Sequence, residues 1–131
     1  MPPPRRRYTI EEANALIPQV RAVILQLAVE QRRLMDLQAA VHRMHEGNGD
    51  PDAAGRVDRL DAESAQVEEE MQNLVEVLAS MGVQLRDIGM GLVDFPAERG
   101  GRAVWLCWRL ADPSVGFWHG TDEGYATRKP W

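Results

Sequence analysis

The chain has 131 residues, of which 44% are hydrophobic and 27% charged, and it carries a net charge of −5. That length predicts one domain, and the acidic balance excludes a general nucleic-acid binder because no basic field would attract phosphates. No apolar run approaches the roughly 18 residues of a transmembrane helix, so we expect no membrane partner. The basic N-terminus lacks the apolar segment of a secretory signal, and the single cysteine, Cys107, fits a reducing compartment. We therefore expect a cytoplasmic protein.

The first segment, residues 1–8, holds three prolines and three consecutive arginines, and we expect it to be a flexible arm. Thr9 then begins a helix, because a threonine at the N-cap with Glu12 three residues later is typical of a capping box. Pro18 lacks the backbone N–H that a helix interior needs, and it disfavours helical geometry in the residue before it. The sequence therefore predicts a short helix over residues 9–16, a break, and a new helix with Pro18 in its first turn.

Two long amphipathic segments follow, over residues 18–46 and 56–81. Their apolar residues recur at steps of three and four, which defines a seam that a partner helix covers along its whole length. The seam residues are Val20, Val23, Leu27, Leu34, Leu37, Val41 and Met44 in the first segment, and Val57, Leu60, Val67, Met71, Leu74, Leu78 and Met81 in the second. A loop over residues 46–55, rich in glycine and aspartate, connects them. The pattern predicts an antiparallel, coiled-coil-like helical hairpin.

The apolar stripe is wider at one end of this hairpin. Ile24 and Leu25 widen it in the first half of the first segment, and Val75 and Val77 widen it near the end of the second. Towards the connecting loop, mostly seam positions are apolar. We therefore expect another part of the chain to cover the base of the hairpin, while the loop end projects as a two-helix arm.

The composition changes after Gly82, a residue that fits a helix C-terminal cap. All four tryptophans and both phenylalanines lie beyond residue 81. Three runs are typical of strands, over residues 92–95, 103–110 and 115–119, and the turn residues between them predict an antiparallel meander. Such a small sheet is only marginally stable alone, so we expect it to pack on the hairpin base.

Together these elements predict a single domain over residues 1–131 of the α+β class, mainly α. It has a helical part over residues 9–81 and a small β unit with a tail over residues 82–131. Alternation in the central strand gives two faces, one with Val104, Leu106 and Trp108 and the other with Trp105, Cys107 and Arg109.

The densest group of polar side chains lies near the C-terminus. His119, Asp122 and Glu123 offer one imidazole and two carboxylates within five residues. With Asp94 or Glu30 from elsewhere in the fold, they would suit a divalent transition metal at a partly open site. The alternative is structural: His119 ends a strand and bonds to the backbone, and the two acids are solvated turn residues.

Glu30 occupies a seam position among apolar residues, where a lone buried carboxylate is costly. Folding the hairpin at residues 50–51 places Glu30 opposite Met71 and near Glu70. Two interpretations remain open. Glu30 pairs with Arg33 or with an arginine of a partner subunit and so fixes the helix register, or it serves as a ligand.

Four residues are candidates for binding a small ligand: Asp94, Arg109, Trp118 and Arg128. An arginine fork clamps carboxylates and phosphates with two parallel hydrogen bonds, unless Arg109 instead pairs with Asp94 on the adjacent strand. Cys107 lies in mid-strand among tryptophans, and alternation places the nearest base, His119, on the opposite face. We therefore interpret Cys107 as a small buried hydrophobe rather than a nucleophile.

Three stretches of the chain carry a family resemblance. They are Tyr8-Thr-Ile-Glu-Glu-Ala-Asn-Ala-Leu-Ile-Pro18, Gly91-Leu-Val-Asp-Phe-Pro96, and Val104-Trp-Leu-Cys-Trp-Arg-Leu110 continued by Trp118-His119, Asp122-Glu123-Gly124 and Arg128. They are similar to a bacterial family named domain of unknown function 2203. Gly120 stands where the resemblance leads us to expect an acidic residue, which weakens that position as a ligand. The resemblance implies a single domain and no particular activity.

Two functions of different classes fit these observations. The first is a non-catalytic interaction module, in which the hairpin pairs with a second copy of the chain as a homodimer, or with another helical protein. The second is a metal-dependent or small-ligand-binding enzyme that uses His119, Asp122 and Glu123. We expect the first.

Overall fold

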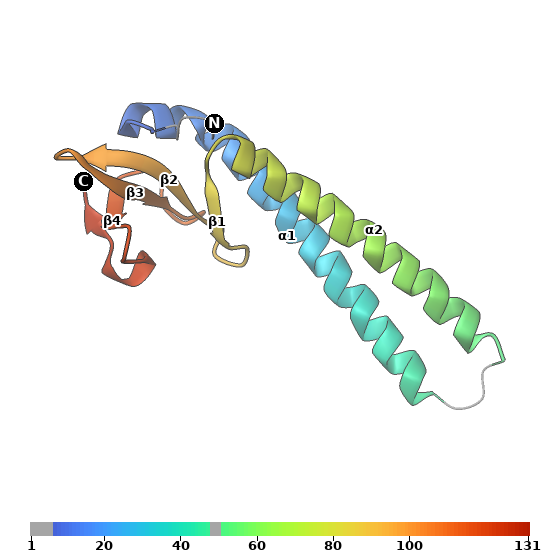
Figure 1. Cartoon of the computed structure of the whole chain (residues 1–131). Helices are drawn as coiled ribbons and strands as arrows, with labels where there is room; N and C mark the ends of the chain where they lie inside the picture. The colour runs from blue at the N-terminus through green and yellow to red at the C-terminus, as the bar shows by residue number, and fades with distance from the viewer. Residues whose placement is uncertain (1–6, 48–50) are drawn as a thin grey trace.

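The computed structural model describes residues 7–47 and 51–131, which form a two-helix hairpin followed by an antiparallel sheet (Figure 1). Helix α1 spans Ile10–Glu46 and helix α2 spans Ala53–Ser80. The five strands follow the order β1-β2-β3-β4-β5 and are β1 (Gln84–Asp87), β2 (Leu92–Arg99), β3 (Arg102–Trp108), β4 (Phe117–Gly120) and β5 (Lys129–Pro130). The predicted α+β fold, mainly helical with a β-meander, is confirmed. Strands β1 and β5 extend the three predicted strands, and residues 48–50 of the predicted loop lie outside the described residues.

The predicted break at Pro18 is wrong, because α1 runs through the proline without interruption. The short helix over residues 9–16 is therefore the first part of α1. Ala13 and Ile17 before the proline and Val20 after it are buried in one core. Their burial outweighs the roughly 3 kcal/mol that proline costs inside a helix. The lost hydrogen bond shows as a bend, because the first turns of α1, blue in Figure 1, run at an angle to the rest.

At the base of the hairpin, the start of α1 and the end of α2 are capped as predicted. The Thr9 hydroxyl accepts from the Glu12 backbone N–H at 3.1 Å, and the Glu12 carboxylate accepts from the Thr9 N–H at 3.0 Å. At the end of α2, Gly82 follows the C-cap residue Met81 with a φ of 76°, in the left-handed region that favours glycine. This turn leads the chain directly into β1.

Tyr8, which the sequence assigns to a flexible arm, is buried and fixed to the sheet. Its backbone N–H donates to the Pro96 carbonyl at 2.7 Å, and its hydroxyl donates to the Met81 carbonyl. Its ring meets the Phe95 ring edge-on, with centroids 5.6 Å apart. The arm prediction is therefore wrong for Tyr8, while residues 1–6 lie outside the described residues.

The core forms between the base of the hairpin and one face of the sheet, here called the inner face. The predicted face of β3 is confirmed: Val104, Leu106 and Trp108 all lie in the core. Val93, Phe95 and Ala97 of β2 also lie on the inner face, and they share this core with Ala13, Ile17, Val20, Ile24 and Leu27 of α1. The sheet therefore covers the base of the hairpin, as the widening of the apolar stripe predicts.

Beyond the sheet the hairpin projects as a two-helix arm (Figure 1). Glu30 is the last buried residue of α1, whereas Val67 and Leu78 are the buried residues of α2. The predicted asymmetry of the hairpin is confirmed. Over the described residues, neither helix has the combined length and apolar character that crossing a membrane requires.

Candidate functional site

The strand register gathers three potential metal-ligating side chains on the outer face of the sheet, the face opposite the core. Asp94 of β2 pairs with Cys107 of β3, and Trp105 of β3 pairs with His119 of β4. Paired residues of antiparallel strands share a face, so Asp94, Cys107 and His119 project to one side. The predicted placement of Cys107 and His119 on opposite faces is wrong. All three residues are buried, and their ligating atoms lie within 4.8 Å of one another; we call them the outer-face cluster.

Both ring nitrogens of His119 are engaged. Nδ1 lies 2.8 Å from the Gly120 carbonyl oxygen, and Nε2 lies 3.0 Å from each carboxylate oxygen of Asp94. A carbonyl oxygen only accepts, so Nδ1 carries a ring proton, while Nε2 faces the Asp94 carboxylate, which accepts a hydrogen bond whenever Nε2 also carries a proton. Because both nitrogens have these partners, His119 is not positioned as a base for Cys107.

Cys107 is a buried thiol with a high pKa. Burial raises the pKa of Cys107 to about 11, and the nearby Asp94 carboxylate adds to this rise. Arg128, beside the thiol, acts in the opposite direction and lowers that pKa. Without a bound cation, Cys107 is therefore a neutral thiol at physiological pH. This agrees with the interpretation of Cys107 from the sequence as a small buried hydrophobe.

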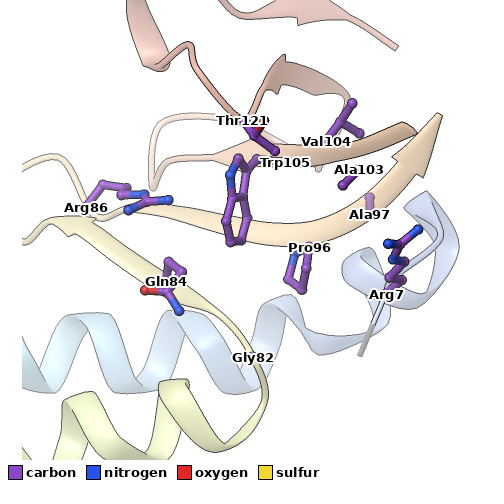
Figure 2. Close-up of a pocket in the computed structure, with 10 residues that line it drawn as sticks. All are labelled: Arg7, Gly82, Gln84, Arg86, Pro96, Ala97, Ala103, Val104, Trp105 and Thr121. Atoms are coloured by element: carbon purple, nitrogen blue, oxygen red, sulfur yellow. The ribbon is translucent and has the colours of Figure 1, made fainter. Parts of the chain in front are cut away.

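Arg86 and Trp105 connect the cluster to two neighbouring hollows. Arg86 Nε donates to Asp94 at 2.9 Å, and the Arg86 guanidinium carbon lies 5.1 Å from the centre of a Trp105 ring. Figure 2 shows the first hollow, of about 350 Å³, with the Trp105 ring between Arg86 and Pro96. The second hollow, also about 350 Å³, is lined by Asp94 and His119 together with Arg86 and Trp105. The cluster therefore lies at the wall of a cavity rather than in sealed core.

Asp112 forms a second buried polar group, which the sequence did not reveal. Arg128 donates to its two carboxylate oxygens at 2.6 and 3.1 Å, and the Arg109 backbone N–H donates at 3.1 Å. Desolvation acts to raise the pKa of Asp112, but the hydrogen bonds from Arg128 and Arg109 outweigh it and hold that pKa below its ordinary value. The predicted pair between Arg109 and Asp94 is wrong, because Arg109 pairs with Asp112 and Asp94 pairs with Arg86.

The four residues predicted to bind a small ligand lie in three places. Asp94 belongs to the outer-face cluster, and Arg109 and Arg128 converge on Asp112. Trp118 packs against the core from the inner face. Both arginines are thus already paired with a carboxylate of the same chain.

The four predicted metal ligands do not form one group, although His119 and Glu123 line the same hollow. His119 joins the outer-face cluster, whereas Glu30 lies on α1. Glu123 accepts from the Gly120 backbone N–H at 2.9 Å and from Lys129 Nζ at 3.1 Å, and these bonds, the first above all, hold its pKa below the ordinary value. Asp122 is exposed. The described residues therefore place His119 with Asp94 and Cys107 rather than with its sequence neighbours.

A different polar feature lies between the two helices. Glu30 lines a groove of about 290 Å³, and its side chain is 7% exposed. Its Oε1 accepts from Gln26 at 2.9 Å, while its buried Oε2 has no hydrogen-bond partner among the residues that the structure describes. Glu70 lines the same groove, as predicted, but Arg33 bonds to Glu63 at 2.8 Å. An unsatisfied buried carboxylate oxygen is costly, so this position needs an explanation.

Comparison with known proteins identifies the family of the chain. A family model described as "Uncharacterized conserved protein (DUF2203)" matches residues 6–131. The chain belongs to this family. The match confirms the resemblance and includes both the outer-face cluster and the groove of this DUF2203 protein. No curated protein and no solved structure matches the chain.

Proposed function

We propose that this DUF2203 chain is a non-catalytic interaction module that forms a homodimer through one side of its helical hairpin. The observation that carries this proposal is the buried Oε2 atom of Glu30, which lacks a partner among the described residues and lies in a groove lined by the half-exposed Val77, while Leu25 and Val29 are exposed on the same helix as Glu30. We call this surface the groove face and define it by Leu25, Val29 and Glu30 of α1 and Glu70 and Val77 of α2.

The groove face exposes large apolar side chains. Leu25 is 50% exposed, Val29 is 60% exposed and Val77 is 43% exposed. Leu25 and Val29 are four residues apart and therefore lie on the same side of α1, while Val77 lines the groove itself. A partner that covers these three side chains removes their apolar surface from water, and this removal favours association.

The floor of the groove face is acidic. Glu30 and Glu70 line the groove, and Arg33 bonds to Glu63, so it offers these two carboxylates its charge but no hydrogen bond: the Glu63 hydrogen bond raises the pKa of Arg33, and the charges of Glu30 and Glu70 add to that rise. The occupant of the groove therefore combines apolar side chains with a positive charge.

The same side of α1 offers that combination. Arg32 follows Val29 by three residues and Leu25 by seven, so the three lie along one stripe. Its side chain is 79% exposed, and its 3.4 Å contact with Asp36 is a weak surface pair. We place a two-fold axis near Val29, so that the α1 helices of the two copies run antiparallel. In this arrangement Arg32 of the second copy lies towards the groove of the first copy that Glu30 lines. Because a two-fold interface is self-complementary, the first copy does the same for the second.

The free cysteine bears on the location of the protein, and the chemistry of the groove face bears on its partner. A single free cysteine, Cys107, supports a reducing compartment, and we propose the cytoplasm. Another helical protein with an apolar stripe and an arginine would fit the groove face by the same chemistry, and we favour a second copy because this chain carries both features itself.

Replacing Val29 by aspartate is expected to turn the dimer into a monomer, because a carboxylate would then be buried beside an acidic groove. We expect the dissociation constant to rise at least about a hundredfold. Sedimentation velocity over the micromolar range measures this change.

Met90→Asp is the matched control for this substitution. Met90 is 37% exposed and lies in the connection between β1 and β2, outside the groove face as defined above, so its dimer should match the wild type. A wild-type protein that stays monomeric over the micromolar range contradicts the proposal, and so does a Val29→Asp variant that dimerises as well as the wild type.

A further inference from the structure

The outer-face cluster lies on the sheet and takes no part in the proposed pairing of the hairpins. We propose that Asp94, Cys107 and His119 bind one zinc-class divalent ion through the Asp94 carboxylate, the Cys107 sulfur and His119 Nε2. The three ligands come from three neighbouring strands and are all buried. The site differs from the sequence-based candidate because it uses neither Asp122 nor Glu123.

The donor set and spacing suit zinc. One oxygen, one sulfur and one imidazole nitrogen form a mixed set that borderline ions such as Zn²⁺ accept. The ligating atoms lie within 4.8 Å of one another. Zinc ligands stand roughly 2.0–2.3 Å from the ion, so two ligands of a tetrahedral site lie about 3.3–3.8 Å apart. The most widely separated pair of the cluster therefore closes by up to roughly 1–1.5 Å when an ion binds, which small side-chain rotations from neighbouring strands supply.

The orientation of His119 is an independent argument for a cation. A metal-binding histidine donates its other ring N–H to a carbonyl or carboxylate, which fixes the tautomer. His119 does this through Nδ1, which lies 2.8 Å from the Gly120 carbonyl oxygen. Its Nε2 then faces the Asp94 oxygens at 3.0 Å, and the two side chains are each 3% exposed. A proton or a metal cation between Nε2 and the carboxylate satisfies both groups.

The competing occupant of that space is a proton. A proton shared by His119 and Asp94 would satisfy both groups, but it gives the adjacent Cys107 sulfur no role. A divalent ion uses all three residues.

The surroundings of the cluster fit an ion with one open position. Arg86 Nε holds Asp94 Oδ2 at 2.9 Å, in the way that outer-shell groups orient a ligating carboxylate. The hollow of about 350 Å³ beside Asp94 and His119 also contacts Trp105 and Tyr125. Three protein ligands and a solvent-accessible fourth position are typical of zinc sites that exchange a bound water.

Metal titration of the purified full chain tests this site. The protein is stripped with a chelator and titrated with Zn²⁺ by calorimetry, and Co²⁺ is added in parallel to detect a thiolate-to-cobalt charge-transfer band. We expect one equivalent of either ion and a charge-transfer band in the wild type. Cys107→Ser should lose the band and weaken zinc binding by more than the roughly tenfold to hundredfold cost of losing an outer-shell partner. His119→Ala should show no stoichiometric binding.

Asp122→Asn serves as the matched control. It removes an exposed carboxylate that the sequence pattern offers as a ligand, and it should bind zinc as the wild type does. Circular dichroism and urea unfolding of the metal-free proteins establish that Cys107→Ser and the isosteric Asp94→Asn are folded. A wild type that binds no ion, or a folded Cys107→Ser variant with unchanged zinc affinity, overturns the proposal and leaves a shared proton between His119 and Asp94.

Discussion

Replacing Asp112 by asparagine is expected to lower the free energy of unfolding by about 3–5 kcal/mol, the usual cost of removing one member of a buried ion pair. The Asp112 side chain is 7% exposed and that of Arg128 is 11% exposed, so neither charge is well solvated. Asparagine keeps the shape of the side chain but leaves the Arg128 guanidinium buried without its counter-charge. Urea unfolding at neutral pH, followed by circular dichroism, measures the loss.

Asp61→Asn is the control for this substitution, because Asp61 is an exposed aspartate of α2. A surface change of this kind is expected to alter the unfolding free energy by no more than about 0.5 kcal/mol. If Asp112→Asn lowers the free energy of unfolding by no more than the control does, the ion pair between Asp112 and Arg128 does not stabilise the fold.

The same pair gives the stability a defined acid dependence. Burial acts to raise the pKa of Asp112, and hydrogen bonds from Arg128 and Arg109 lower it further than burial raises it. The folded-state pKa therefore lies below the unfolded value of about 3.9. The contribution of this carboxylate is fully present above the unfolded value and is lost as the pH falls through the folded one. The unfolding free energies of wild type and Asp112→Asn should therefore converge in acid, and a gap that persists unchanged into strong acid contradicts the assignment.

Glu30→Leu is expected to change stability in the opposite direction and raise the free energy of unfolding by about 1–3 kcal/mol. The buried Oε2 of Glu30 has no hydrogen-bond partner in the described part of the chain, and Leu27 and Leu34 flank it along the apolar seam. Leucine removes the unsatisfied oxygen and continues the seam. Thermal unfolding at several protein concentrations measures the gain, because only the dimer contribution depends on concentration.

Glu69→Leu provides the comparison, since Glu69 is an exposed glutamate of α2. It should leave the stability nearly unchanged. A Glu30→Leu variant that unfolds more readily than the wild type would show that Glu30 already has a stabilising partner within one chain. A gain in stability supports the view that the Glu30 carboxylate serves binding, although it lowers the stability of the monomer.

The helical hairpin was predictable because one apolar period continues through two long segments. The widening of the stripe at one end also predicted where the sheet packs. The predicted break at Pro18 was wrong, because the helix-breaking preference of proline considers only the local backbone. It takes no account of the tertiary core, in which Ala13, Ile17 and Val20 of one continuous helix are buried. Burial overrode the local preference of the backbone.

The sheet was only partly predictable. Strand β1 (Gln84–Asp87) is short and mostly polar, and β5 (Lys129–Pro130) has two residues, so neither carries a run of apolar or β-branched side chains. The pairing of Trp105 with His119 depends on the conformation of the connection between β3 and β4, which spans residues 109–116. A register different by one residue would turn His119 to the other face. This explains why the sequence separated His119 from Cys107.

The two candidate sites differ in what the sequence reveals. A carboxylate in an apolar seam marks Glu30 from sequence alone, but its lack of a partner needed the coordinates, because the nearby Arg33 bonds to Glu63 instead. The outer-face cluster joins residues from three strands, so no spacing along the chain marks it. Alternation in β3, combined with the correct β3–β4 register, would have placed Cys107 on the same face as His119 and so among the candidate metal ligands.

Oxidative cross-linking of a Val29→Cys variant tests the central claim most directly, because the proposed two-fold axis passes near Val29 and sets its two copies face to face. Met90→Cys is the control, and the native Cys107 is 1% exposed and should not react. We predict a disulfide-linked dimer from Val29→Cys on a non-reducing gel and a monomer from Met90→Cys. Equal cross-linking of the two variants, or none from Val29→Cys, contradicts association of the hairpins through the groove face.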